Sequence, residues 1–401
     1  MLASCCFSGC AVKKLKTEER PGYSVSFYQP EENATICAMQ KTAEGLQVLS
    51  KKGDVTALLT LSESYAMQAS EVLCENGQQS VCTFFQAESS RLLWRRDELS
   101  GYETIERDGK VLPFSNEFHL SDSPSLAQNS EGEVFAFVEG AIISLSGGQM
   151  ELPLPNADGN SYVPSCLTEA DGTVYLLLAE QCQDGLTRKT VATYLCKLGN
   201  TQAVSLGERL PQEGEICRTA FCAESLYVLC NDTIFCINGE TSIVVVDLLS
   251  LGISGNTVVQ MLVQEDGKII LALSDALAVL QPGIVETRTQ LRLAALKNQS
   301  EGIKTVAAQF NRSSSDYFIE VVLFSSQETM NLSVAAKDSY DFICSTDPDL
   351  LNSYGKKGIL TPLDGIGALQ SDELFQNVLN TFRFDGALYY FMPNFILFGM
   401  R

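Results

Sequence analysis

The sequence predicts a multidomain protein in which an all-β, propeller-like domain of about six blades is followed by a partial α/β lobe. Three observations lead to this prediction. Strand-like runs separated by turns repeat from residue 23 to residue 285, the repeat has a regular spacing, and the pattern changes to strand, helix, strand after residue 286. The predicted parts are therefore 1–22, a short leading segment, 23–285, the propeller, and 286–401, the lobe.

The repeated unit of the first region is a turn, a strand-like run, a second turn and a second run, as in "EGEVFAFVEGAIISLSGG" and "DGKIILALSDALAVLQPG". Equivalent turn positions, Gly132, Gly172, Glu224 and Gly267, are 40, 52 and 43 residues apart. Four-stranded propeller blades repeat every 40 to 50 residues or so, which gives about six blades. Two β-sandwiches are the alternative that this spacing makes less favourable. Trp94 is predicted to pack between blades.

The composition limits the classes of partner. The chain has 401 residues, with 49 acidic and 28 basic side chains and a net charge of −21. Phosphate is repelled by such a charge, so neither nucleic acid nor an anionic membrane surface is an expected partner. With 45% hydrophobic residues and no interior apolar run of membrane-spanning length, the sequence indicates a soluble globular protein with large cores.

The cysteines give no metal-binding pattern. There are 14 cysteines without a C-x-x-C pair, and the only histidine is His119, so no metal site is expected. Cys230 and Cys236 fall in strand-like runs, where a cysteine usually acts as a small buried hydrophobe. Disulfides between Cys217 and Cys222, or between Cys230 and Cys236, are alternatives for an oxidising compartment.

The leading segment has features of a lipoprotein signal. In "MLASCCFSGC", small residues precede Cys5 and Cys10, as they do at lipoprotein signal peptidase sites. A complete signal also has a basic start and an apolar run of about 7–15 residues, which this start lacks. We interpret residues 1–22 as the remnant of such a signal, with Cys5 or Cys10 lipidated and the protein on the extracellular face of the cell membrane. A cytoplasmic protein with a cysteine-rich start is the alternative.

The last region has the pattern of a parallel sheet. "LRLAAL" predicts a strand, the next run has apolar residues at helical spacing, and "YFIEVVLF" predicts a second strand. A strand, helix and strand of these lengths form a βαβ unit. Further on, Asp385 and Gly386 in "FRFDGALYY" predict a tight hairpin.

Four phrases in this region resemble, in order, the amino-terminal lobe of bacterial extracellular solute-binding proteins, the capture components of ABC importers. They are "LRLAAL", "VAAQFNRSSSDYFIEVVLF", "STDPDLLNSYGKKGILTPLDGI" and "DELFQNVLNTFRFDGALYYFMPNF". The resemblance implies a periplasmic-binding-protein-like lobe, one of two that close on a ligand. The second lobe is missing and the stretch before "STDPDLL" is shorter than in the family, so we expect either a truncated chain or a vestigial lobe.

The resemblance implies capture of a small polar solute, a carbohydrate for this type of importer, with the importer permease as a partner. The residues nearest the family's cleft are Asn298, Thr346, Asp347, Asn394 and Phe395, which offer hydrogen-bonding groups and an aromatic ring for a sugar. The alternative is a cell-surface propeller that binds a protein or a glycan, with the lobe vestigial.

Catalysis is not expected from the motifs. The sequence has one histidine and lacks a G-x-S-x-G elbow, a P-loop and a G-x-G-x-x-G after a strand, so no catalytic residue and no cofactor is predicted. The "DPD" at 347–349 lacks the ligand count and glycine of a calcium loop. It predicts a helix start instead, with Pro348 in the first turn.

Overall fold

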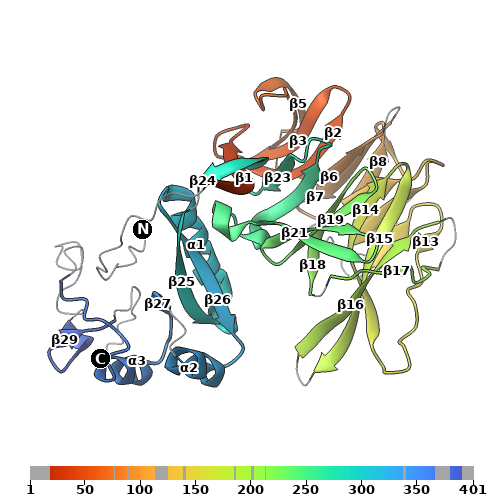
Figure 1. The fold of residues 1–401 in the computed structure, drawn as a ribbon. Helices are drawn as coiled ribbons and strands as arrows, with labels where there is room; N and C mark the ends of the chain where they lie inside the picture. The colour runs from red at the N-terminus through yellow and green to blue at the C-terminus, as the bar shows by residue number, and fades with distance from the viewer. Residues whose placement is uncertain are drawn as a thin grey trace, which may run out of the picture. The chain divides into compact units, whose positions relative to one another are not determined.

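A computed structural model of the chain describes residues 19–75, 77–87, 90–112, 125–138, 141–184, 187–199, 203–212, 214–286, 288–336, 340–365 and 380–390 (Figure 1). The chain divides into two compact units, one spanning Glu19–Val285 and a second that begins at Glu286. In the described residues, the first unit consists of strands and turns with two short 3₁₀ helices, Leu249–Leu251 and Gly255–Thr257. All the described α-helices belong to the second unit.

The first unit is a six-bladed β-propeller, because it contains six four-stranded sheets. Blade one consists of β2 (Thr35–Thr42), β3 (Gly45–Lys52), β4 (Val55–Leu61) and β5 (Met67–Cys74). Blade two consists of β6 (Gln79–Gln86), β7 (Arg91–Asp97), β8 (Glu103–Arg107) and β9 (Lys110–Val111). Blade three consists of β10 (Ser125–Gln128), β11 (Val134–Val138), β12 (Ala141–Ser144) and β13 (Gly148–Gln149). Blade four consists of β14 (Ser161–Ala170), β15 (Thr173–Asp184), β16 (Thr187–Lys197) and β17 (Glu208–Arg209). Blade five consists of β18 (Ile216–Cys222), β19 (Ser225–Cys230), β20 (Thr233–Asn238) and β21 (Thr241–Asp247). Blade six consists of β22 (Val258–Val263), β23 (Ile269–Leu273), β24 (Leu277–Glu286) and β1 (Glu19–Tyr28). The prediction of about six blades is confirmed.

The blades form a closed ring. The first strand of each blade contacts the first strand of the next, from β2 through β6, β10, β14 and β18 to β22, and β22 contacts β2. These six strands are therefore the innermost ones. The closing blade combines β22, β23 and β24 with β1, in the order β1-β24-β23-β22. Both ends of the unit meet in this one blade, so opening the ring would require β1 to leave its sheet.

Apolar side chains fill the spaces between neighbouring blades. Trp94 of blade two is 0% exposed and packs in one cluster with Leu126 and Ile143 of blade three. The prediction that Trp94 lies between blades is confirmed. Leu277 of blade six packs in the same way against Val48 of blade one. Each such side chain contributes about 1.5–3 kcal/mol when it is fully removed from water, and this burial holds the ring together.

The turn between the first and second strands carries the sequence repeat. Gly132, Gly172, Glu224 and Gly267 fall in this turn in blades three, four, five and six. Asp171 and Gly172 have φ angles of 48° and 69°, the left-handed conformation that a two-residue type I′ hairpin turn requires. The intervals measured in the sequence therefore separate structurally equivalent positions of successive blades.

The second unit contains a parallel sheet of three strands in the order β26-β25-β27. Its elements are β25 (Thr289–Leu296), the 3₁₀ helix Lys297–Gln299, α1 (Ser300–Ser313), β26 (Tyr317–Phe324), α2 (Gln327–Ala335), β27 (Phe342–Ile343), α3 (Pro348–Lys356), β28 (Arg383–Phe384) and β29 (Ala387–Leu388). The predicted strand, helix and strand are confirmed, as is the hairpin, in which Asp385 and Gly386 have φ angles of 49° and 82°.

Local contacts explain how this unit is held. The side chain of Asn311 on α1 is 2% exposed and bonds the backbone of Ile319 on β26 in both directions, accepting from its N–H at 2.6 Å and donating to its carbonyl at 3.0 Å. Pro348 stands in the first turn of α3, as predicted. These features establish a small α/β unit. They do not show the partial solute-binding lobe that the resemblance implied.

Candidate functional site

The strands around the propeller axis are bent at corresponding positions. Five of the six innermost strands have a register shift against their neighbours, and the residues skipped are Cys37, Cys82, Ser165, Cys217 and Val259. A bulged residue has no partner across the ladder, and its side chain is turned relative to the regular strand. Three of the five residues are cysteines, so half-buried thiols gather on the innermost strands.

Burial disfavours the thiolate form of these cysteines. Burial raises the pKa of Cys37 and of Cys217, and it raises the pKa of Cys82 to about 11. Only the thiolate is a nucleophile, and a raised pKa keeps the thiol protonated at neutral pH. The bulged cysteines therefore act as small, weakly polar side chains at the axis.

No disulfide forms among the 11 cysteines of the described residues. Cys217 and Cys222 lie toward opposite ends of the same strand, β18. Cys230 lies opposite Thr233, whereas Cys236 lies opposite Tyr227. The two disulfides that the sequence left open are therefore absent. Cys230 is 4% exposed and fits the prediction of a buried hydrophobe.

Polar side chains of the innermost strands connect neighbouring blades at three of the six junctions. The Gln260 side chain accepts a hydrogen bond from the backbone N–H of Met39 at 2.8 Å. Gln40 bonds the backbone of Gln86 in both directions, at 2.6 and 2.9 Å. The Arg218 guanidinium donates to the carbonyl of Val259 at 2.6 Å. These groups satisfy the edges of the neighbouring strands, which indicates a structural role for them.

One face of the propeller carries a series of carboxylates. Every blade begins at its innermost strand and runs up and down in the same order, so the turns between first and second strands lie on one face. In the five of these turns that the structure describes in full, an exposed acidic side chain is present, and we call this surface the acidic-turn face. Its carboxylates are Glu44, Glu131, Asp171, Glu224 and Asp266.

The turn of blade six lies near side chains of blades five and one. Burial, followed by the negative charges of Glu265 and Asp266 in blade six, raises the pKa of Cys222 in blade five. Burial, followed by Tyr28 and Asp266, also raises the pKa of Tyr65 in blade one. Asp266, which is also paired with Lys268 of its own turn at 3.5 Å, thus lies near side chains of both neighbouring blades.

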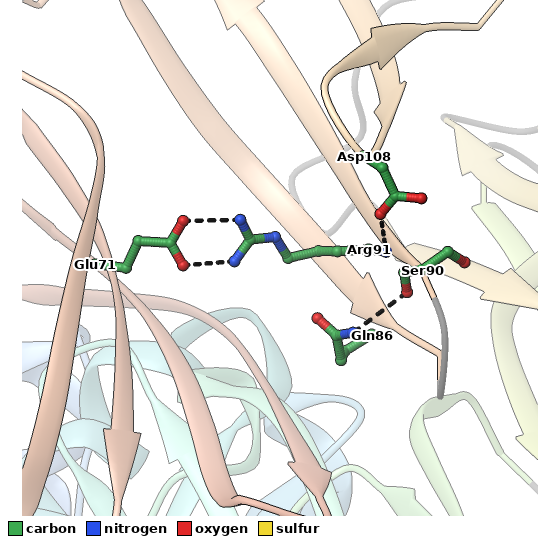
Figure 2. A network of polar contacts seen from close by, with 5 residues as sticks. All are labelled: Glu71, Gln86, Ser90, Arg91 and Asp108. Carbon is green, nitrogen blue, oxygen red and sulfur yellow. Dashed lines mark hydrogen bonds and ion pairs between the residues drawn. The ribbon is translucent and has the colours of Figure 1, made fainter.

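Figure 2 shows a polar network where the outer parts of blades one and two meet. Arg91 on β7 donates two hydrogen bonds to Glu71 on β5, at 2.6 and 2.7 Å. This pairing lowers the pKa of Glu71 and raises that of Arg91. The backbone N–H of Arg91 donates to Asp108 at 2.8 Å, and the Gln86 side chain donates to the carbonyl of Ser90 at 3.3 Å. The network links two blades.

Blade four contains a buried carboxylate. Glu180, 7% exposed, accepts hydrogen bonds from Asn156 and Asn160 at 2.7 Å each and from the hydroxyl of Tyr194 at 2.8 Å. The bond from Asn160 is the main cause that lowers the pKa of Glu180, against a smaller opposing effect of burial. An ionised carboxylate with both oxygens engaged is suited to holding the 156–160 loop. No sequence motif indicated this network.

The structure places three of the predicted ligand residues at one edge of the parallel sheet. Asn298 follows β25, and Thr346 and Asp347 follow β27, the strand next to it. All three are exposed. Asp347 is the N-cap of α3, where its side chain accepts from the backbone N–H groups of Asp349 and Leu350 at 3.0 and 3.2 Å. For Asp347 the structure therefore supplies a structural role.

The other predicted site residues, Asn394, Phe395, Cys5 and Cys10, lie outside the described residues, as does His119. Their assignment to a sugar site or a lipid anchor stays a prediction. Among the residues that are described, no group of three or more His, Cys, Asp or Glu side chains is arranged to hold a metal ion. No helix within the described ranges is long and apolar enough to cross a membrane.

The fold and these sites define a six-bladed propeller protein, and comparisons with known proteins add likeness at the level of fold. No family model matches the sequence, and no curated protein matches it. A solved streptogramin B lyase is 12% identical, with a TM-score of 0.37, covering 65% of this chain and 98% of its own. A PQQ-bound aldose sugar dehydrogenase from Streptomyces coelicolor is 11% identical, with a TM-score of 0.37, covering 66% and 100%. The WD40 propeller domain of Doa1 is 10% identical, with a TM-score of 0.32, covering 65% and 97%.

The exclusion of an enzyme, which rested on absent motifs, is corrected by these comparisons. Two of the similar structures named above are a lyase and a dehydrogenase. The absence of the usual nucleophile and nucleotide motifs therefore does not exclude catalysis for a chain of this fold. At 10–12% identity the likeness concerns the fold alone, and neither an activity nor a partner is transferred to this chain.

Proposed function

We propose that the propeller binds a protein and that the partner docks on the acidic-turn face with lysine and arginine side chains. The observation that carries this proposal is the recurrence of an exposed carboxylate in each fully described turn of that face. Repetition in five blades gives one surface a patterned negative charge, while the short turns restrict how far each carboxylate can move.

The electrostatics favour a basic partner. Charges across an interface act over about 8 Å at physiological ionic strength, so neighbouring turns act together on a cation that approaches the face. The net charge of −21 also attracts a basic protein from a distance and repels an acidic one. Binding should therefore be fast and strongly dependent on salt.

Two variants of equal charge test the role of the face. The first neutralises the acidic turns (Glu44→Gln, Glu131→Gln, Asp171→Asn, Glu224→Gln and Asp266→Asn). The control neutralises five exposed carboxylates in the loops of the opposite face (Glu32→Gln, Asp54→Asn, Asp158→Asn, Glu215→Gln and Asp275→Asn). Both raise the net charge by five from −21. Binding of a fluorescent oligo-lysine peptide is measured by anisotropy at low and physiological salt.

We expect the acidic-turn variant to bind the peptide about tenfold more weakly, which corresponds to ~1.4 kcal/mol, and the control variant to bind like the unmodified chain. An equal loss in both variants would show attraction by net charge without a docking face and would overturn the proposal. Thermal unfolding of both variants checks that the propeller is intact, because the exchanged side chains are exposed.

Solute capture by the second unit is a second candidate. Its support is the placement of Asn298 and Thr346 after adjacent parallel strands, the edge where ligands of such sheets bind. The test is thermal unfolding against a panel of neutral sugars, because a ligand that binds the native state raises the transition. A shift that is lost in an Asn298→Ala, Thr346→Ala variant would favour this candidate. A shift that persists there would point to a glycan on the propeller.

A further inference from the structure

Strand β21 is an unprotected edge of the propeller. It is the outermost strand of blade five, and among the described strands it pairs with β20 alone. Ile243 and Val244 are 63% and 62% exposed, although consecutive residues of a strand point to opposite faces. Thr241 and Ser242 are exposed as well. The edge therefore offers backbone hydrogen-bonding groups between apolar, β-branched side chains.

The outer strands of the other blades are protected in the ways that natural proteins use against edge pairing. Three of them, β9, β13 and β17, are only two residues long. The edge of β5 carries Glu71, which is ion-paired with Arg91. Strand β1 contains Pro21, which has no N–H to donate. Among the outer strands in the described part of the chain, only β21, with the sequence TSIVVVD, has neither a short length, a proline nor a charge in its centre.

We infer that β21 accepts an extended segment of another protein as a fifth strand of blade five. The main-chain groups of the incoming segment would complete the ladder, and its side chains would cover Ile243 and Val244. This inference rests on the proposed function in that it assumes a protein partner, but it assigns that partner a second contact away from the acidic-turn face.

The charges at the ends of β21 determine the kind of segment. Glu240 precedes the strand and Asp247 ends it, and both are exposed. In the antiparallel register that places Ile243 opposite Val244 of a second copy, Glu240 would face Asp247 at both ends, and directly opposed like charges are destabilising. Two copies with a charge of −21 also repel each other. The complementary occupant is a different chain with a β-branched centre and a lysine or arginine at each end.

The test uses the full chain and a labelled peptide, Lys-Thr-Val-Ile-Val-Thr-Lys with blocked ends. We expect saturable binding, about tenfold weaker for Glu-Thr-Val-Ile-Val-Thr-Glu, and about tenfold weaker for the Val244→Lys variant than for the unmodified chain. The control is Val72→Lys, at a 48% exposed valine on the outer strand β5, which should bind normally. The acidic-turn variant should also keep most of its affinity, so this test and that of the proposed function can fail separately.

Other occupants give different results. A dimer in sedimentation that becomes a monomer on Val244→Lys would identify a second copy and overturn the inference. No peptide binding, with β21 amides already protected from hydrogen exchange in the free protein, would show that the chain itself covers this edge. Equal loss in the Val72→Lys control would show non-specific association, which also overturns it.

Discussion

The innermost and outermost strands of the propeller differ in what fixes them. Five of the six innermost strands have a bulge at a corresponding position, and some carry side chains that bond the next blade, such as Gln260 to Met39. The outermost strands share almost nothing, ranging from two residues in β9 to ten in β1. Closing a ring requires every blade to meet the same geometric condition at the axis, whereas no such condition acts at the rim. Partner-specific features therefore belong at the rim and in the turns.

The largest expected effect on stability comes from removing a buried side chain between blades. Trp94→Ala should destabilise the propeller by about 3–5 kcal/mol, because the large side chain is 0% exposed and leaves a cavity that its neighbours cannot fill. Denaturant unfolding measures the change, with Leu99→Ala, at an 83% exposed position, as the control. A loss below about 1 kcal/mol would mean that the space between blades two and three adapts easily, against this view of the ring.

An axial tie should have a smaller effect. Gln260→Ala leaves the N–H of Met39, a residue 1% exposed, without its bond, and an unsatisfied buried donor costs about 1–3 kcal/mol. Gln149→Ala, on the exposed outer strand β13, is the matched control and should unfold like the unmodified protein. If both variants have the same stability, the ties between innermost strands are incidental, and packing alone closes the ring.

Acid should weaken the loop that Glu180 holds. Because the folded structure lowers the pKa of Glu180 below its usual value of 4.5, the carboxylate contributes stability that is fully present above pH 4.5 and is lost as the pH falls through the folded pKa. Glu180→Gln should therefore be less stable at neutral pH, with a difference that shrinks in acid. Unfolding curves across this range measure it, with the exposed Glu75→Gln as a control. A difference independent of pH would contradict an ionised Glu180.

The repeat was readable from the sequence because its signal is local. Gly172 and its equivalents mark turns whose backbone requires particular residues, so their spacing gave the blade length. The partnership of β1 with β24 and the Glu180 network depend on residues far apart in the chain, which no local pattern records. The acidic-turn face had a visible signal, since Asp171 and Glu224 stand in the very turns that define the repeat.

Two ion pairs near the junction of blades one and two give the prediction with the smallest expected effect: the pair of Glu71 and Arg91 links the two blades, whereas Arg95 and Glu106 both belong to blade two. Glu71 and Arg91 have side chains 53% and 30% exposed, whereas those of Arg95 and Glu106, at 2.8 Å, are 17% and 20% exposed. Arg95 also donates to the carbonyl of Leu73 in blade one, at 3.1 Å. Double-mutant cycles with glutamine should give Glu71 and Arg91 a coupling of about 0.2–1 kcal/mol that disappears in high salt. The less exposed pair should couple more strongly and resist salt, because water screens it less. A stronger coupling between Glu71 and Arg91 than between Arg95 and Glu106 would mean that contacts at the rim help to close the ring. The rim could then not vary freely to suit different partners.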